Sequence, residues 1–375
     1  MTIGILKEPA GENRVVMAPA AVEALVKKKA SVIIEKGAGD QSFYSDESYR
    51  ANAKTGSRDE VIEKSDILLC ITGPGKDDIG KMRKGQSLIS VLNPLVDKET
   101  VEALKAKGVT AFSLDILPRT TRAQSMDILS SMATAAGYKA VLDAAMHLPR
   151  FFPMFMTAAG TIAPAKALIL GAGVAGLQAI ATARRLGAKV EAFDVRSAVK
   201  EEVMSLGAKF VEVEGAVEDE KAGGYGVEQT EEFKKRQQQL IHEHASKSDV
   251  IISTAQIPGK KAPLLVRKET VEAMKPGSVI VDLAASTGGN CELTKPGENI
   301  VHRGVIILGN TAYPSTIPSD ASKMFGQNVL NFISLIIDEE GSLKLDFEDE
   351  LVRETCVCHD GEYLSNRIIE FYKEK

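Results

Sequence analysis

Short apolar runs alternate with amphipathic stretches along most of the chain. Runs rich in β-branched residues occupy 31–34, 67–70, 167–170, 250–252 and 279–281, and each has the length of a buried strand. The stretches between them carry apolar residues at helical spacing. This alternation predicts parallel strands covered by helices, which is the α/β class with doubly wound, Rossmann-like sheets.

Several helix boundaries can be placed from their end signals. Pro19 suits a first helical turn, and Asp97 is a good N-cap for a helix that runs to Lys107 and ends at Gly108. Residues 228–244 are strongly charged, which predicts a solvent-exposed helix.

A long helix predicts where the chain passes from one domain to another. Residues 124–148 contain no proline and one glycine, Gly137, and as a helix they would extend roughly 36 Å. A second helical stretch at 320–337 could return the chain to the first domain.

We therefore expect two Rossmann-like domains that are separated by a cleft and joined by these long helices. Residues 1–130 together with 320–375 would form the N-terminal domain, and residues 131–319 the second domain. The chain has 375 residues, a length that exceeds one ordinary hydrophobic core.

Composition narrows the function classes. Apolar residues make up 44% and charged residues 26% of the chain, as in ordinary globular proteins. The net charge of −5 gives no excess of positive potential for a phosphate backbone, so we expect no nucleic-acid partner.

The N-terminus and the most apolar stretch bear on cellular location. The chain opens on a predicted strand from Thr2 rather than on a signal peptide. The apolar stretch at 161–183 is divided by Lys166 and by the glycines of 171–176. We expect a cytoplasmic protein without a membrane span.

The four cysteines do not form a disulfide or metal pattern. Cys70, Cys291, Cys356 and Cys358 lack the density of a disulfide scaffold. The run from Cys356 to His359 has no second ligand pair at zinc-finger spacing. We expect free thiols and no metal site.

The sharpest motif is a glycine turn between a strand and a helix. Gly171, Gly173 and Gly176 follow the strand at 167–170 in the spacing GxGxxG, and a helical pattern begins at once. In this motif the first glycine allows a tight turn, the second lets a pyrophosphate approach the backbone, and the third lets helix and strand pack closely. The turn predicts a dinucleotide at a helix N-terminus.

An acidic residue at the end of the next strand favours NAD(H). Asp194 ends the strand at 189–193, and a carboxylate there can accept hydrogen bonds from an adenosine ribose. It would also repel the 2′-phosphate of NADP(H), although Arg196 two residues later partly offsets this effect.

Two further strand ends are candidates for the same site. Thr254 and Ala255 follow the strand at 250–252, and Leu283 follows the strand at 279–281. An open α/β sheet binds its ligand at the carboxyl ends of its strands. The alternative is that both segments are ordinary strand-end turns.

The chain resembles the NAD(H)-binding component of proton-translocating transhydrogenases over nearly its whole length. The most specific block is 118–131, with the sequence PRTTRAQSMDILSS, and the glycine turn, 274–278 and 288–291 also fit. In that family this component passes hydride directly to NADP(H) held by another subunit, and a membrane subunit couples the exchange to proton movement.

The resemblance implies a split enzyme with separate partner polypeptides. The chain would form a homodimer and associate peripherally with the inner membrane through an NADP(H)-binding subunit and a membrane-spanning subunit. It has neither a membrane-spanning segment nor a second dinucleotide fingerprint of its own.

The resemblance also assigns residues. Arg119, Gln124, Asp127 and Ser130 would line the nicotinamide end of the site, and Gly224 with Tyr225 would belong to a mobile loop that closes over the nucleotide. The expected NAD(H)-binding residues are Gly171, Gly173, Val174, Ala175, Gly176, Asp194, Val195, Arg196, Gly224, Tyr225, Thr254, Ala255 and Leu283.

The residues of the 119–131 block allow two interpretations by themselves. A helix would place Gln124, Asp127 and Ser131 on one face, and Arg119 could pair with Asp127 and fix it. The other interpretation is a capped, charged helix start without a role in binding.

Alanine dehydrogenases are the main alternative. They share this architecture, and Arg14 lies in a segment, 13–19, that looks like their substrate-carboxylate-binding segment. Their catalytic lysine and histidine align with Thr72 and Asn93, and neither of these residues can serve as a general base near neutral pH. A catalytically silent NAD(H)-binding module is the third hypothesis.

Overall fold

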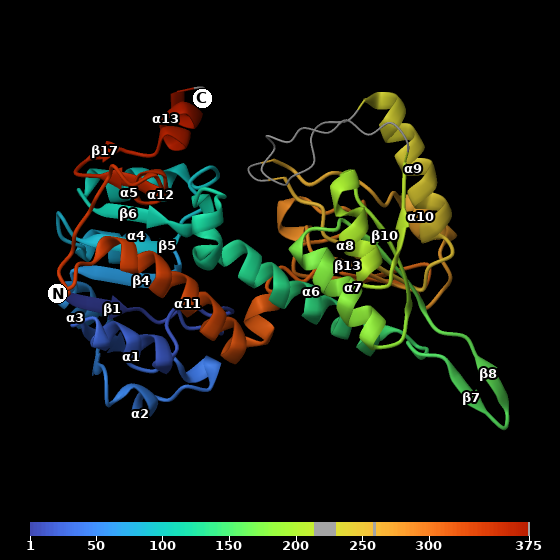
Figure 1. The fold of residues 1–375 in the computed structure, drawn as a ribbon, viewed down its shortest axis with the longest axis horizontal. Helices are drawn as coiled ribbons and strands as arrows, with labels where there is room; N and C mark the ends of the chain where they lie inside the picture. The colour runs from blue at the N-terminus through green and yellow to red at the C-terminus, as the bar shows by residue number, and fades with distance from the viewer. Residues whose placement is uncertain (214–229, 258–259, 374–375) are drawn as a thin grey trace. The chain divides into compact units, whose positions relative to one another are not determined.

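The computed structural model describes residues 1–213, 230–257 and 260–373 (Figure 1). These residues form two compact units. Unit 1 comprises Met1–Met132 and Pro314–Lys375, and unit 2 comprises Ala133–Tyr313. Both ends of the chain therefore belong to unit 1.

Unit 1 is built on an eight-stranded sheet in which six neighbouring strands are parallel. The strand order reverses between β1 and β4, so the chain winds outward in both directions from the centre, as in a doubly wound fold. In spatial order the strands are β17 (Glu362–Tyr363), β16 (Cys356–His359), β6 (Thr110–Ser113), β5 (Ser87–Val91), β4 (Ile67–Thr72), β1 (Thr2–Ile5), β2 (Ser31–Glu35) and β3 (Lys54–Gly56).

Helices cover both faces of the unit 1 sheet. On one face α1 (Pro19–Lys27) and α11 (Pro318–Ile336) bury aliphatic and aromatic side chains against the strands. The helices that contribute to the core on the other face are α3 (Arg58–Lys64), α4 (Lys76–Lys81), α5 (Lys98–Ala106) and α13 (Asn366–Lys373). The remaining helices are α2 (Asp46–Tyr49) and α12 (Glu350–Thr355), with short 3-10 turns at η1 (Asp40–Ser42), η2 (Leu114–Ile116), η3 (Thr121–Met126) and η7 (Tyr313–Thr316).

Unit 2 repeats the same winding around a seven-stranded sheet. Six strands are parallel, and the order reverses between β9 and β12. The last strand is antiparallel to its neighbour. In spatial order the strands are β11 (Lys209–Val211), β10 (Lys189–Phe193), β9 (Lys166–Leu170), β12 (Val250–Ser253), β13 (Val279–Asp282), β15 (Val305–Leu308) and β14 (Asn299–His302).

The helices of unit 2 also lie on both faces of its sheet. On one face α7 (Val174–Arg185), α8 (Lys200–Ser205) and part of α6 (Ile128–His147) pack with alternate strand residues. On the other face the core includes residues of α9 (Glu231–Ala245) and α10 (Lys268–Ala273). Other local elements are η4 (Ser197–Val199), η6 (Ala285–Thr287) and a hairpin of β7 (Phe155–Thr157) and β8 (Gly160–Ile162) that projects from the unit (Figure 1).

The predicted α/β class and most predicted elements are confirmed. Each of the five apolar runs forms a strand, and Pro19 begins α1. The carboxylate of Asp97 accepts the backbone N–H of Thr100 at 3.1 Å and caps α5. Gly108 adopts a φ of 71°, in the left-handed region that glycine favours.

The prediction of one continuous helix over 124–148 is wrong at its start. Gln124 lies in the 3-10 turn η3, Asp127 has extended backbone angles, and α6 begins only at Ile128. The Asp127 carboxylate bonds the backbone N–H of Ser130 and stops the helix from extending further back. Gln124, Asp127 and Ser131 therefore do not share one helical face.

The long helices have different packing demands. On α6, Gly137 faces the backbone of α7, where a Cβ would lie 2.1 Å from the carbonyl oxygen of Ala175, so a side chain at that position would force the two helices apart. In the parts of the chain that the structure describes, every helix is too short or too polar to cross a membrane.

Candidate functional site

The glycine turn of unit 2 lies at the carboxyl end of the central strand β9. Gly171 adopts a φ of 100°, which favours glycine, and Gly173 is the N-cap of α7. A Cβ on Gly176 would lie 1.9 Å from the carbonyl oxygen of Gly171. A Cβ on Gly173 would meet no atom of the described residues within 4 Å. The turn is thus tightly packed behind and open where a ligand would approach.

Asp194 fixes this turn from the neighbouring strand. Its carboxylate accepts the backbone N–H of Ala172 at 2.7 Å, and the Nε and NH2 groups of Arg196 bind its two oxygens at 2.9 and 2.8 Å. The pair is partly buried. The hydrogen bond from Asp194 raises the pKa of Arg196, which stays charged. Asp194 and Arg196 thus form an ion pair beside the turn.

The predicted segments after β12 and β13 reach the same edge of the sheet. The hydroxyl of Thr254 donates to the carbonyl oxygen of Gly171 at 3.1 Å. The backbone N–H of Leu283 donates to the carbonyl oxygen of Ser253 at 2.9 Å. Four predicted parts of the site, the glycine turn, Asp194, Thr254–Ala255 and Leu283, therefore follow four adjacent strand ends of one sheet.

The residues predicted to line the nicotinamide end lie in unit 1. The oxygens of Asp127 accept the backbone N–H and the hydroxyl of Ser130 at 2.9 and 2.6 Å, so both residues cap α6. Gln124 and Arg119 are exposed. These contacts account for a helix cap, and the catalytic role of the block stays a prediction. The predicted lid residues, Gly224 and Tyr225, lie outside the described residues.

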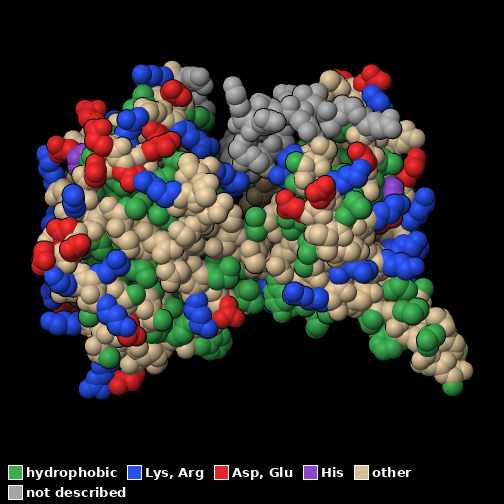
Figure 2. All heavy atoms as spheres, in the orientation of Figure 1, with side chains coloured by type: hydrophobic (Ala, Val, Ile, Leu, Met, Phe, Trp, Pro, Cys, Tyr) green, Lys and Arg blue, Asp and Glu red, His purple; other side chains and the backbone are tan. Residues whose placement is uncertain are grey.

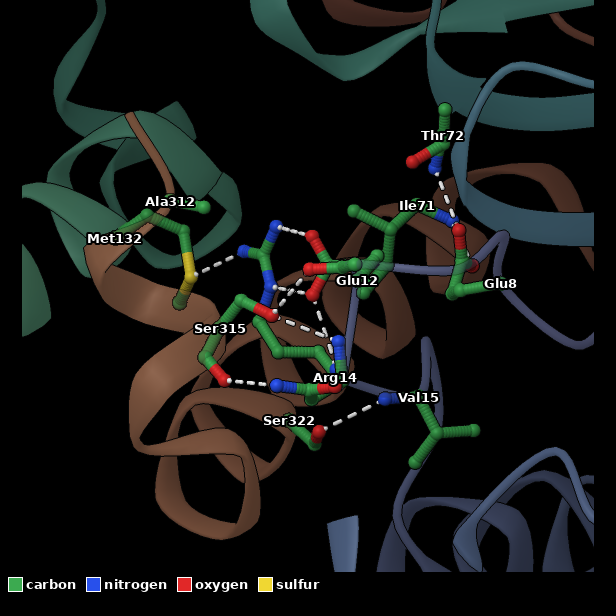
Figure 3. Close-up of polar contacts among 12 residues, drawn as sticks. Glu8, Glu12, Arg14, Val15, Ile71, Thr72, Met132, Ala312, Ser315 and Ser322 are labelled. Atoms are coloured by element: carbon green, nitrogen blue, oxygen red, sulfur yellow. Dashed lines mark hydrogen bonds and ion pairs between the residues drawn. The ribbon is translucent and has the colours of Figure 1, made fainter. Parts of the chain in front are cut away.

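Arg14 meets a carboxylate of its own chain (Figure 3). Its Nε and NH2 bind the two carboxylate oxygens of Glu12 at 2.8 and 2.6 Å, and its NH1 lies 2.9 Å from the sulfur of Met132. Burial alone would raise the pKa of Glu12, but the hydrogen bonds and charge of Arg14 outweigh it and lower that pKa. The arginine that would bind a substrate carboxylate is thus paired with an internal one.

A second carboxylate occupies the point where the unit 1 sheet reverses. The oxygens of Glu8 accept the backbone N–H groups of Ile71 and Thr72 at 2.6 and 2.9 Å (Figure 3). Burial raises the pKa of Glu8 to about 7, although the two backbone hydrogen bonds oppose this shift. A pocket of about 400 Å³ beside it is lined by residues that include Glu8, Glu35 and Arg58.

Glu8 and Glu12 are the residues that the sequence reasoning missed. Glu8 stands three residues after β1, where unit 2 has its glycine turn after β9. An acidic residue at that position is a signal against phosphate binding, because it places negative charge where a phosphate would lie. Unit 1 therefore has the winding of a dinucleotide-binding fold but a carboxylate in place of the phosphate-binding turn.

Comparison with known proteins places similarity along nearly the whole chain. A family model described as alanine dehydrogenase/PNT, N-terminal domain, matches residues 4–136, and the corresponding C-terminal domain model matches residues 140–366. A Rhodospirillum rubrum protein, the first polypeptide of a divided NAD(P) transhydrogenase subunit alpha, is 45% identical over 372 residues, which cover 96% of this chain and 97% of that protein.

A solved structure and a more distant relative complete the comparison. The crystal structure of transhydrogenase from Sinorhizobium meliloti superposes with a TM-score of 0.86 at 39% identity and covers 98% of this chain and 100% of that one. An alanine dehydrogenase of Mycolicibacterium smegmatis is 28% identical over 98% of this chain and 96% of its own length.

Glu8 should make stability depend on pH. The unfolded chain releases this proton near pH 4.5 and the folded chain near pH 7, so the folded state binds more protons between these values and its stability falls as the pH rises through them. Relative to the Glu8→Gln variant, we expect the free energy of unfolding of the wild type to decrease by up to about 3 kcal/mol from pH 4.5 to pH 8.

Urea denaturation of both proteins across this range measures the difference. The Glu63→Gln change on exposed α3 is the matched control, and its difference from the wild type should vary far less with pH. A wild-type minus Glu8→Gln difference that stays constant with pH would contradict the assignment.

Proposed function

Because the chain belongs to the alanine dehydrogenase/PNT family, we propose that it is the NAD(H)-binding subunit of a proton-translocating NAD(P) transhydrogenase. It transfers hydride directly between NADH and NADP⁺ held by a partner subunit. The observation that carries this proposal is the open glycine turn beside Asp194, in a chain that matches a transhydrogenase alpha subunit almost from end to end.

NAD(H) fits the described residues of unit 2. The N–H groups at the start of α7 and its helix dipole favour a pyrophosphate, and Gly173 leaves room for it. Asp194 can accept from an adenosine ribose. Because Asp194 already binds Arg196, the preference for NAD(H) over NADP(H) depends on the orientation of this pair.

The proposed chemistry asks the protein for positioning rather than for proton transfer. Bound NADH supplies a hydride from its nicotinamide ring. Gln124 would offer its amide to the ribose or carboxamide, and Asp127, Ser130 and Arg119 would orient that end of the nucleotide. Exclusion of water suffices for the rest, so Thr72 and Asn93 need no basic side chain.

The two alternative functions are disfavoured. Oxidation of alanine needs a general base, and the ion pair of Arg14 with Glu12 occupies one edge of the guanidinium that would bind a substrate carboxylate. A silent NAD(H)-binding module would need the glycine turn and Asp194 but has no use for the block at 119–130.

We propose that the assembled protein is a homodimer with two further subunits. One would hold NADP(H), and the other would span the membrane and couple transfer to proton movement. The subunit would thereby associate peripherally with the inner membrane from the cytoplasm. Support for the dimer comes from the projecting β7–β8 hairpin, whose apolar side chains gather at the surface (Figure 2).

This hairpin carries more exposed apolar surface than a lone hairpin needs. Phe155 is 41% exposed, Met156 75% and Ile162 41%, and nearby Met154 is 56% exposed. Such clustered apolar side chains mark protein–protein contact sites. A second copy of the chain is the partner that fits the homodimer.

Rapid mixing with the NADP(H)-binding subunit tests the proposed reaction. The chain loaded with NADH should convert partner-bound NADP⁺ to NADPH, and Gln124→Ala should slow that step by about tenfold or more while NADH affinity changes little. Alanine oxidation by the chain alone would support the dehydrogenase, and binding without turnover would support the silent module.

The control for this series is Gln41→Ala, another exposed glutamine in a 3-10 turn of unit 1. Its transfer rate should equal that of the wild type. Equal losses of NADH affinity and transfer rate in Gln124→Ala would contradict the role assigned to Gln124.

The Gly173→Ala variant tests the nucleotide position. An added methyl group meets open space and should leave the melting temperature unchanged, yet it should weaken NADH binding by about tenfold because it fills the approach to the pyrophosphate. Fluorescence titration with NADH measures the affinity. Gly80→Ala, whose Cβ also meets no described atom within 4 Å, should bind NADH normally; normal binding by Gly173→Ala would place the nucleotide elsewhere.

The Met156→Asp variant tests the dimer. Loss of one buried methionine costs about 2 kcal/mol, so we expect the dimer to dissociate at roughly 30-fold higher concentration in sedimentation velocity. Met204→Asp, which changes another exposed methionine, should remain dimeric. A monomeric wild type, or a dimer unaffected by Met156→Asp, would remove the hairpin from the interface.

A further inference from the structure

A fully buried carboxylate lies beneath the nucleotide edge of unit 2. Asp282 is the last residue of β13, and its side chain is surrounded by donors of its own chain. Oδ1 accepts from Ser253 Oγ (3.1 Å) and Ala284 N (3.0 Å), and Oδ2 accepts from Asn290 N (2.8 Å), Cys291 N (3.0 Å) and Thr294 Oγ1 (2.7 Å).

These hydrogen bonds fold the segment after β13 back over its own strand end. Gly288 and Gly289 adopt φ values of 102° and 77°, and a Cβ on Gly289 would lie 2.8 Å from Oδ2 of Asp282. The two glycines let the backbone turn around the carboxylate. Asn290 is thereby brought to a fixed place behind the segment that follows β12.

The side chain of Asn290 joins the two strand ends. Its Oδ1 accepts the backbone N–H of Ala255 at 3.1 Å, and its Nδ2 donates to the carbonyl oxygens of Ala255 and Pro263 at 2.9 and 2.8 Å. Asn290 is fully buried. Both amide hydrogens are used, so the amide can face in one direction only.

The next residue back along the chain connects this amide to the glycine turn. Thr254 precedes Ala255, and its hydroxyl reaches the carbonyl oxygens of Leu170 and Gly171 at 3.3 and 3.1 Å. A continuous set of hydrogen bonds thus runs from Asp282 through Asn290 and Ala255 to Gly171. Every member belongs to the rigid ends of three adjacent parallel strands.

We propose that Asn290 is a positioning residue for the nicotinamide half of the bound nucleotide. The inference rests on the proposed function. Asp194, the candidate for the adenosine ribose, follows β10 on one side of β9, whereas Ala255 follows β12 on the other side. A dinucleotide that crosses the turn therefore lays its nicotinamide half over the segment that Asn290 holds.

Replacement of Asn290 by aspartate disturbs this contact with almost no change in size. One carboxylate oxygen can still accept from Ala255 N, but the other must face the carbonyl oxygens of Ala255 and Pro263, which repel it. The repulsion should shift the segment after β12 and leave Asp194 and the glycines in place. The expected defect is in the geometry of hydride transfer.

The experiment separates the two halves of the nucleotide. ADP-ribose contains the adenosine and both phosphates but no nicotinamide. Calorimetry should show that Asn290→Asp binds ADP-ribose within about twofold of the wild type, whereas single-turnover transfer from NADH to the NADP⁺-loaded partner subunit slows by about tenfold or more. Asn299→Asp makes the same chemical change on the exposed edge strand β14 and should transfer at the wild-type rate.

A second pair of variants decides the matter if Asn290→Asp does not fold. Thr254→Val keeps the shape of the side chain but loses its hydroxyl, and Thr254→Ser keeps the hydroxyl. The proposal expects slow transfer with valine and near wild-type transfer with serine, at unchanged ADP-ribose affinity in both.

Two results would overturn the positioning role. One is a folded Asn290→Asp that transfers hydride as fast as the wild type, and the other is an equal loss of ADP-ribose affinity, NADH affinity and rate. A wild-type chain that binds no NADH would overturn the proposed function and this inference together. Normal NADH binding and transfer by the wild type with normal transfer by Asn290→Asp would overturn this inference alone.

Discussion

The backbone N–H groups at the carboxyl ends of the central strands must find acceptors, and the two units satisfy this demand in different ways. In unit 1 the carboxylate of Glu8 accepts two of them, from Ile71 and Thr72. In unit 2 the carboxylate of Asp194 accepts from Ala172, and the turn beyond it is left open at Gly173. The same winding of strands thus produces one end closed by a side chain and one available to an anion.

This difference explains why a chain with two similar sheets has a single dinucleotide motif. A buried carboxylate in unit 1 puts negative charge where phosphates would lie, and its raised pKa reflects how little water reaches it. Arg14 is balanced in the same way by Glu12. Unit 1 is therefore rich in internal ion pairs near its strand ends, whereas unit 2 offers backbone donors there.

Much of the fold could be predicted because each element carried its own local signal. Apolar runs marked β2, β4, β9, β12 and β13, and Asp97 and Pro19 marked helix starts. The glycine turn was predictable because its spacing reports backbone shape directly. The start of α6 was not, because helical periodicity continues through Gln124 while one short side-chain contact, from Asp127 to Ser130, sets the boundary. The bonds of Glu8, Glu12 and Asn290 were also hidden, since their partners depend on chain winding rather than on spacing.

The close contact between Gly137 and Ala175 has a consequence for engineering. Helix α6 starts at the cap formed by Asp127 and Ser130, and further along it touches the backbone of the second residue of α7. A chimaera that takes this helix from another protein must keep a residue without a side chain at the touching position. Otherwise the donor helix would push α7, and the loop that precedes it, out of register with the sheet.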